Sequence, residues 1–178
     1  MPRKKRVWFP GAAYHIISRG NRKSELFRYS IDFKYFLSIL KQTKEDYPFK
    51  LMGYCLMRNH IHLQIKTEEI EIWKIMRKLN LFYAKYFNKR YDLMGHLFQG
   101  RYYSNLIEDH SENLTISRYI HLNPVEAEIV SDPAKYRWSS YAYYLGLMES
   151  DLVDEELVLS YYSKNSREKY KKYVESEL

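Results

Sequence analysis

Cysteine is almost absent from this chain, which has Cys55 and no other among its 178 residues. One cysteine excludes an internal disulfide and any zinc site built from several cysteines, so a bound metal would need histidine and oxygen ligands. Long hydrophobic runs are missing too, and none approaches the roughly 20 residues of a membrane span. The first ten residues, MPRKKRVWFP, are basic and lack the apolar segment of a signal peptide. We therefore expect a soluble, cytoplasmic protein without a membrane partner.

Acidic residues are outnumbered, with 22 Asp and Glu against 29 Lys and Arg, and the formal charge is +7. A positive charge favours a polyanionic partner, because basic side chains that neutralise phosphates release counterions. Aromatic residues are plentiful, at 19 Tyr, 8 Phe and 3 Trp. Basic side chains mixed with aromatic rings suit single-stranded nucleic acid, whose bases stack on rings. A basic protein with a tyrosine-rich core has the same composition, so composition leaves both interpretations open.

Hydrophobic periodicity predicts six elements between residues 13 and 109. They are, in order, a strand at 13–19, a helix at 31–46, strands at 49–57 and 60–66, a helix at 69–88 and a strand at 104–109. The order strand, helix, strand, strand, helix, strand is that of the ferredoxin-like or RRM-like fold. We predict an α+β fold with an antiparallel sheet, helices on one of its faces, and the other face free for a ligand.

A further helix is predicted from about Asp109, where Asp109 and Glu112 form a start that resembles a capping box. Asn123 and Pro124 are expected to close or kink it, because the residue before a proline is pushed out of helical geometry. A basic helix is predicted at about 163–174 in the tail. No linker between these elements divides the chain into two separate domains.

The stretch MRNHIHLQI places two of the six histidines, His60 and His62, on either side of one isoleucine. On a strand, side chains two residues apart share a face and lie about 6–7 Å apart along the backbone, so the two imidazoles can converge on one ion. A polar strand face that happens to hold two histidines is the alternative. Two ligands are too few for a closed structural site, which favours an open ion that also takes phosphate oxygens or water. The sequence leaves the third ligand open among the carboxylates and His15, His96, His110 and His121.

A second feature, RYIHLNP at 118–124, places Tyr119 and Asn123 four residues apart, and therefore on one face of the predicted helix. A tyrosine hydroxyl can form a covalent intermediate, but its ordinary pKa of about 10 makes it a weak nucleophile at neutral pH. A nearby divalent cation and basic side chains would assist it, and the carbonyl oxygen of Asn123 could join the shell of that ion. Among 19 tyrosines, a packing role is the alternative for Tyr119.

Together these features resemble the HUH single-strand endonucleases, in which U stands for a hydrophobic residue. The chain is most similar to their one-tyrosine transposases of the IS200 type and, within these, to the REP-associated tyrosine transposases. Five blocks carry the resemblance: YHIISRGN (14–21), YCLMRNHIHL (54–63), GHLFQGRYYS (95–104), RYIHLNPVEAEIV (118–130) and WSSY (138–141). One departure is Arg58, in the turn before His60, where the family more often has proline.

The resemblance implies that His60 and His62 bind Mg²⁺ or Mn²⁺ and that Asn123 completes or orients the shell of the ion. It also implies that Tyr119 attacks a phosphate of single-stranded or hairpin DNA, which leaves a 5′-phosphotyrosine bond and a free 3′-OH. Such a protein is a metal-dependent endonuclease and strand transferase acting on hairpin-forming repeat DNA, and it is nucleoid-associated when bound. The alternative is a protein of the same fold that binds structured repeat DNA without cutting it.

Basic residues elsewhere are candidates for the DNA path, with a solvated surface as the alternative. They are Arg3, Lys4, Lys5 and Arg6 in an N-terminal arm, Arg19, Arg22 and Lys23 after the first strand, and Arg101. His15 is expected to be a hydrogen-bonded core histidine. The predicted division is a basic arm at 1–10, the catalytic domain at 11–145 and a C-terminal helical extension at 146–178. That extension favours a monomer over a homodimer.

Overall fold

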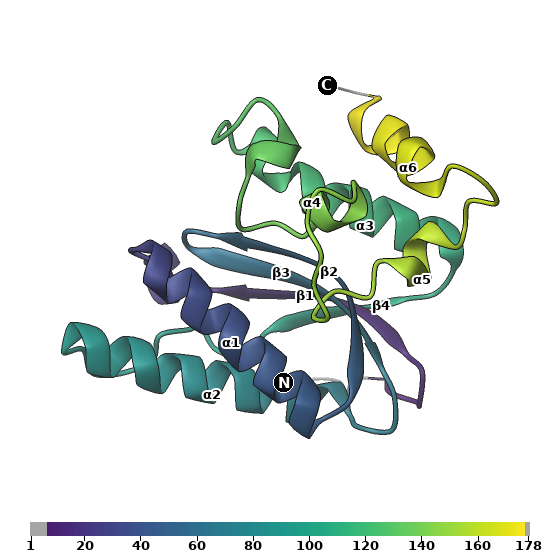
Figure 1. Ribbon diagram of the computed structural model, residues 1–178. Coiled ribbons are helices and arrows are strands. Elements are labelled where there is room, and N and C mark those ends of the chain that lie inside the picture. Colours follow the sequence, from purple (N-terminus) through teal and green to yellow (C-terminus); the bar gives the residue numbers. More distant parts are fainter. Residues whose placement is uncertain (1–6, 177–178) are drawn as a thin grey trace.

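Figure 1 shows a computed structural model of the chain, which describes residues 7–176. The strands are β1 Ala13–Arg19, β2 Phe49–Met57, β3 His60–Thr67 and β4 Tyr103–Ile107. The helices are α1 Ser30–Asp46, α2 Ile72–Tyr91, α3 His110–Glu126, α4 Tyr141–Tyr144, α5 Glu156–Leu159 and α6 Ser166–Glu175, with 3₁₀ turns η1 Asn21–Lys23 and η2 Pro133–Lys135. The predicted arm residues lie outside the described residues, so their contact with DNA stays a prediction; they are Arg3, Lys4, Lys5 and Arg6.

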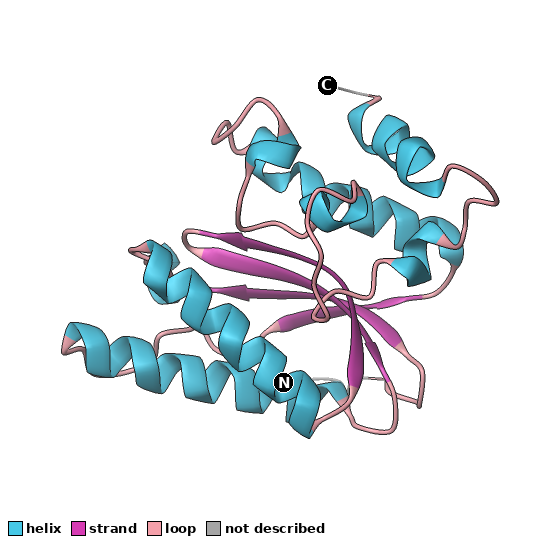
Figure 2. Ribbon diagram, in the orientation of Figure 1, coloured by secondary structure: helices cyan, strands magenta, loops and turns pink. Residues whose placement is uncertain are grey.

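The four strands form one antiparallel sheet in the order β2-β3-β1-β4 (Figure 2). The predicted ferredoxin-like α+β arrangement is therefore confirmed. The first two strands begin and end where periodicity predicted them. The fourth strand begins one residue earlier than predicted, at Tyr103, and ends at Ile107. Helix α2 begins and ends three residues later than predicted, and the left-handed backbone of Asp92 (φ 50°) terminates it directly after Tyr91.

Helices α1 and α2 pack together on one face of the sheet, as predicted (Figure 1). Alternate residues of β3, namely Ile61, Leu63 and Ile65, are fully buried in this main core. Burying a side chain of this size contributes roughly 1.5–3 kcal/mol, so the layer anchors β3 firmly. Trp138 stacks on Phe33 of α1 with ring centroids 4.4 Å apart and packs against the main core.

The opposite face of the sheet is not open along its length, contrary to the prediction. Helix α3 crosses this face and contacts β2 and β3 (Figure 1). Ile116 and Ile120 of α3 are buried with Cys55 and Met57 of β2 in a small second core. The apolar stripe of an amphipathic helix must be buried, and the exposed sheet beside it supplies the apolar surface. The β4 edge of the same face stays accessible, where Tyr103 is 61% exposed.

Pro124 neither closes nor shortens α3, which continues to Glu126. The predicted end of the helix at Asn123 is therefore wrong, and the predicted kink stays a prediction. Pro124 lies in the last turn, so its missing N–H removes a single bond from the helix. The carbonyl oxygens of Asn123 and Pro124 still accept hydrogen bonds, from the backbone N–H of Ala127 at 3.0 Å and of Ile129 at 2.9 Å. Asn123 thus keeps its helical position relative to the preceding turn.

The C-terminal helix α6 packs on α3 (Figure 1). The hydroxyl of Tyr170 lies 2.6 Å from Oγ of Ser117 and 2.8 Å from Nδ1 of His121, and all three residues are fully buried. The other ring nitrogen of His121, Nε2, lies 2.8 Å from Oγ of Ser140, just before α4. This buried network ties α6 and the chain before α4 to the back of α3, and so holds α3 in place over the sheet.

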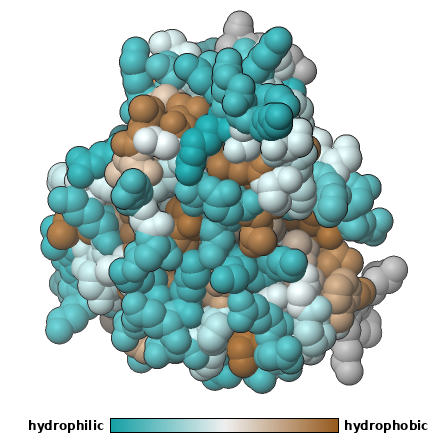
Figure 3. Space-filling model, turned by 45° about the vertical axis from the view of Figure 1, so that its right-hand side comes forward, coloured by the Kyte–Doolittle hydropathy of each residue, from teal (hydrophilic) through white to brown (hydrophobic). Residues whose placement is uncertain are grey.

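Within residues 7–176, no helix combines the length and the apolar character that crossing a bilayer requires. The face shown in Figure 3 is mostly hydrophilic, and its hydrophobic residues lie in small separate patches. Isolated exposed hydrophobic side chains of this kind are normal for a globular protein.

Candidate functional site

The two histidines of the HIH stretch lie together on the sheet face that α3 crosses. The ring centroids of His60 and His62 are 5.0 Å apart, with the ring planes at 83°. Ile61 between them is fully buried in the main core. The prediction that both imidazoles share one strand face is therefore confirmed, and it follows from the two-residue period of a strand.

Hydrogen bonds orient the imidazole of His60. Its Nδ1 lies 2.7 Å from Oδ1 of Asn59; because an amide oxygen only accepts, Nδ1 carries the proton and donates it. The Nε2 of the neutral ring then has a lone pair, and it lies 3.5 Å from Oδ1 of Asn123. The amide nitrogen of Asn123 donates to the carbonyl oxygen of Tyr119 at 3.3 Å, which directs Oδ1 toward His60. Two lone pairs thus face each other, and a cation between them would satisfy both.

His62 is 1% exposed, and burial lowers its pKa to about 2, with His60 and His15 adding to the shift. Its Nδ1 lies 3.0 Å from Nε2 of His15, whose pKa burial lowers to about 4. Both rings are therefore neutral at pH 7, and one of these nitrogens donates to the other. When Nδ1 of His62 is the donor, its Nε2 has a lone pair. That buried Nε2 makes no hydrogen bond within residues 7–176.

His15 is hydrogen-bonded and buried, as predicted, but its partner is a residue of the site. Its ring stacks on that of His62 with centroids 5.3 Å apart. A histidine ligand commonly has its second nitrogen held by such a partner, which fixes the tautomer and the orientation of the ring. The position of His15 therefore matches that of a residue supporting His62.

Tyr119 of α3 lies beside the histidines. Its ring centroid is 5.4 Å from that of His62 and 5.9 Å from that of His15, with an edge-to-face arrangement in both cases. The residue is 41% exposed, so its ring borders both the histidines and solvent. Asn123, one helical turn further along α3, is nearly buried. The helical spacing and the crossing of α3 together bring these two side chains to β3.

Within residues 7–176, no group of three or more His, Cys, Asp or Glu side chains could hold a metal ion. Among the described residues, neither a carboxylate nor one of His15, His96, His110 and His121 joins His60 and His62 in such a group. The candidate ligand atoms are His60 Nε2 and Asn123 Oδ1, which lie 3.5 Å apart, together with the buried His62 Nε2 when His62 carries its proton on Nδ1. Burial lowers the pKa of His60 and of His62, and a hydrogen bond to the Asn123 side chain opposes this shift in both residues. The carboxamide of Asn123 is therefore close to both rings. Three such ligands would leave coordination positions open for substrate oxygens.

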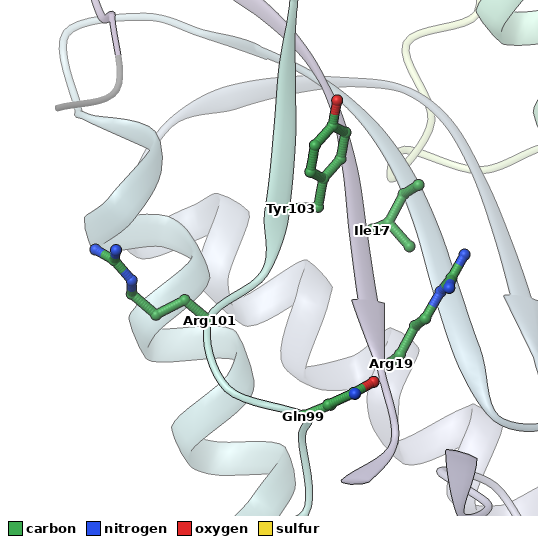
Figure 4. Close-up of a pocket in the computed structure, with 5 residues that line it drawn as sticks. All are labelled: Ile17, Arg19, Gln99, Arg101 and Tyr103. Atoms are coloured by element: carbon green, nitrogen blue, oxygen red, sulfur yellow. The ribbon is translucent and has the colours of Figure 1, made fainter. Parts of the chain in front are cut away.

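Arg19 is the predicted DNA-path residue that lies closest in the sheet to this group. It pairs with His60 across β1 and β3, and its positive charge helps to lower the pKa of His60 and His62. A cavity of about 400 Å³ opens beside it (Figure 4) and is lined by Ile17, Arg19, Gln99, Arg101 and Tyr103. In Figure 4 the guanidinium of Arg101 extends away from the other four side chains.

Arg22 and Lys23 lie in the turn that follows β1, where both adopt a left-handed backbone with φ of 53° and 61°. Both residues are exposed. The turn is held by a hydrogen bond from the backbone N–H of Asn21 to the carbonyl oxygen of Leu97 at 2.8 Å. Their contact with DNA stays a prediction.

Three residues around the site were not among those predicted from the sequence: Asn59, Gln99 and Tyr103. Asn59 lies in the β2–β3 turn, and its place next to His60 in the sequence was the available signal. Tyr103 was missed because the predicted fourth strand began one residue too late. Alternate residues of a strand share a face, so Ile107, Asn105 and Tyr103 of β4 point to the same side of the sheet. Tyr103 pairs with Ile17, which pairs with His62, so this is also the face of the histidines. No sequence signal indicated Gln99, whose position depends on the fold of its loop.

Comparisons with known proteins identify the relatives of this chain. The family model described as "Transposase IS200 like" matches residues 9–123, which include both histidines, Tyr119 and Asn123. A curated protein of Haemophilus influenzae (strain Rd), named as a REP-associated tyrosine transposase, is 29% identical over 140 residues, which is 72% of this chain and 77% of that protein. A solved REP-associated tyrosine transposase bound to a REP hairpin superimposes with a TM-score of 0.70. It is 18% identical, over 86% of this chain and 94% of that one, and shows that the fold is shared.

Proposed function

The chain belongs to the family of IS200-like transposases, and we propose that it is a metal-dependent endonuclease and strand transferase for single-stranded DNA, with Tyr119 as its nucleophile. The observation that carries the proposal is the convergence of unshared lone pairs beside an accessible tyrosine. His60 Nε2 faces Asn123 Oδ1, His62 Nε2 is buried without a partner in the described part of the chain, and the Tyr119 ring lies 5.4 Å from that of His62. A purely structural cluster would pair these atoms with hydrogen-bond donors.

His60, His62 and Asn123 would hold one Mg²⁺ or Mn²⁺ ion. When bound, the ion would supply Lewis-acid polarisation of a phosphate oxygen. Imidazole nitrogens and an amide oxygen are acceptable ligands for Mn²⁺, whereas Mg²⁺ prefers oxygen and usually retains several waters. Because two of these ligands are nitrogens, Mn²⁺ is expected to bind more tightly than Mg²⁺.

Tyr119 would act at a phosphate held beside the histidine pair. Its hydroxyl oxygen forms a bond to phosphorus, and the bond from phosphorus to the 3′ oxygen breaks. The phenol loses one proton to water and the departing 3′ oxygen takes one up, so the step is balanced and leaves a 5′-phosphotyrosine and a 3′-OH. Attack by a 3′-OH on the phosphotyrosine reverses these bond changes and rejoins strands. No external energy source is needed, because each step exchanges one phosphate ester for another.

The proposed substrate is DNA that forms a hairpin with an unpaired segment beside it. The relative with the shared fold was solved with a REP hairpin. The charge of +7 favours phosphate binding. Arg19 is the cation placed to contact a phosphate at the histidine pair, while Arg22, Lys23 and Arg101 are proposed to contact DNA further from it. A monomer is proposed as the working unit, with the C-terminal helices completing the support of α3.

The test is the formation of a covalent adduct. The protein is incubated with end-labelled hairpin oligonucleotides carrying unpaired flanks, with Mg²⁺ or Mn²⁺, and resolved under denaturing conditions. Wild type should give a shifted, labelled protein band, and Tyr119→Phe should give none. Tyr29→Phe, at an exposed tyrosine before α1, is the matched control and should behave as wild type. His60→Ala should abolish the adduct, whereas His110→Ala, at an exposed histidine, should not.

A protein that binds DNA without cutting it is the competing function. It would bind the same hairpins in a gel-shift assay and form no adduct with any of them. An adduct that persists in Tyr119→Phe would refute Tyr119 as the nucleophile and leave the family assignment intact.

A further inference from the structure

We infer that the cavity lined by Ile17, Arg19, Gln99 and Tyr103 binds one unpaired nucleotide next to the phosphate held at the histidine pair. The inference rests on the proposed function and adds a position at which that DNA is recognised. In Figure 4 these four side chains border the open space in front of β1, and the cavity measures about 400 Å³. That volume is within the usual range of small-ligand pockets.

The cavity lies on the same sheet face as the histidines. In the sheet register, His62 pairs with Ile17 on β1, and Ile17 pairs with Tyr103 on β4. Directly paired residues of antiparallel strands point to the same face. Neighbouring strands are about 4.8 Å apart, so Tyr103 lies about 10 Å from His62 across the sheet. A nucleotide whose phosphate lies at the histidine pair can therefore place its base over Tyr103.

Tyr103 supplies a stacking surface. It is 61% exposed on the edge strand. Within residues 7–176, its ring stacks on no other aromatic ring and its hydroxyl makes no hydrogen bond. An exposed ring next to a half-buried aliphatic residue, Ile17, offers a flat apolar surface that a base can cover. Stacking of a base on an aromatic ring is tolerant of sequence, since every base has a π-face.

Gln99 supplies a group that can read the base. Its loop is held against the end of β1 by two backbone hydrogen bonds: Gln99 N–H to the Arg19 carbonyl oxygen at 2.9 Å, and Asn21 N–H to the Leu97 carbonyl oxygen at 2.8 Å. Gly100 allows the chain to turn directly afterwards with φ of 76°. The carboxamide has both donors and an acceptor, which suits the edge of a base. The loop therefore holds the Gln99 carboxamide on a fixed backbone, from which it can form hydrogen bonds with the edge of a base.

Arg19 supplies the charge between the cavity and the histidines. It pairs with His60 in the register and lines the cavity, and no carboxylate is among the lining residues. In Figure 4 its guanidinium points along β1 toward Ile17. A phosphate between Arg19 and His60, with its base on Tyr103, would leave the edge of the base available to Gln99. This arrangement favours an unpaired base, because a base paired within a duplex has both faces covered by its neighbours.

The test measures stacking without cleavage. Tyr119→Phe protein, without added metal, is titrated with hairpin oligonucleotides in which 2-aminopurine replaces each flanking unpaired base in turn. Quenching of its fluorescence is expected at one position. Tyr103→Leu in the same background should abolish that quenching and weaken binding about 5- to 150-fold, the effect of losing one stacked base. Tyr103→Phe should retain both the quenching and the affinity. Trp73→Leu, which removes an exposed ring on α2, is the matched control and should change neither.

Gln99→Ala gives an independent readout. With oligonucleotides that vary only at the quenched position, wild type should distinguish the four bases, and Gln99→Ala should bind all four alike. Either of two results would overturn the inference. In the first, adding Tyr103→Leu to Tyr119→Phe leaves the quenching unchanged. In the second, Tyr103→Leu weakens binding of a hairpin without unpaired flanks as much as binding of a hairpin that has them. Failure of wild type to form an adduct would count against the proposed function alone, because the stacking measurement needs neither metal nor nucleophile.

Discussion

Replacing His15 by leucine should weaken binding of Mn²⁺ at the candidate site, although His15 is not itself a ligand. In the tautomer that leaves a lone pair on Nε2 of His62 for an ion, Nδ1 of His62 donates its proton to Nε2 of His15, 3.0 Å away in a buried environment. Without that acceptor, the buried N–H is unpaired, at a cost of about 1–3 kcal/mol. His62 avoids the cost by carrying its proton on Nε2 instead, where Asn123 Oδ1 is within reach. That proton occupies the lone pair needed by the ion, so the Kd for Mn²⁺ should rise about 10- to 100-fold.

The assay is a titration of Mn²⁺ into the DNA-free protein at neutral pH, with the free ion measured by electron paramagnetic resonance. His15→Gln places an amide oxygen near the position of Nε2 and should restore most of the affinity. His110→Leu changes an exposed histidine outside the site and should leave the Kd unchanged. Urea unfolding of each variant separates a loss of affinity from a loss of fold.

Two outcomes would refute the reasoning at different points. Equal affinity in wild type and His15→Leu, with affinity lost in His60→Ala, would show that His15 has no part in orienting His62. Affinity that survives both His60→Ala and His62→Ala would place the ion elsewhere and remove the proposed ligand set.

Three further predictions concern stability and DNA binding. Asp32→Asn should destabilise the fold by about 2–4 kcal/mol in urea unfolding, because two tyrosine hydroxyls and two backbone N–H groups donate to this buried carboxylate. Burial alone would raise the pKa of Asp32, but these bonds lower it below its usual value. Its stabilising effect is therefore present above pH 4 and is lost as the pH falls further, so the difference between the two proteins should shrink in acid. Tyr170→Phe should cost about 1–3 kcal/mol by leaving two buried partners unpaired, whereas Tyr162→Phe should cost little. Arg19→Gln should weaken binding of all hairpins and reduce the slope of log K against log salt by about 1, and Lys34→Gln on α1 should not.

Local periodicity was enough for much of the architecture. A two-residue alternation identified β1, β2 and β3 and placed His60 and His62 on one face, because side-chain direction in a strand depends only on its own backbone. A spacing of four placed Tyr119 and Asn123 together on α3 for the same reason. Errors arose where tertiary contacts decide boundaries, as at Pro124, which helical packing accommodates near the end of α3.

Residues distant in the sequence meet only because of packing. Asn123 reaches His60 from 63 positions away, and His62 bonds to His15 across 47. Both contacts depend on the register of β1 with β3 and on the crossing of α3, which buries Ile116 and Ile120 against β2. Burial of apolar side chains on both elements decides that crossing, and local periodicity carries no information about it. The sequence by itself determined which side chains share a face; the tertiary structure decided that the histidine pair, the tyrosine and the asparagine share one site.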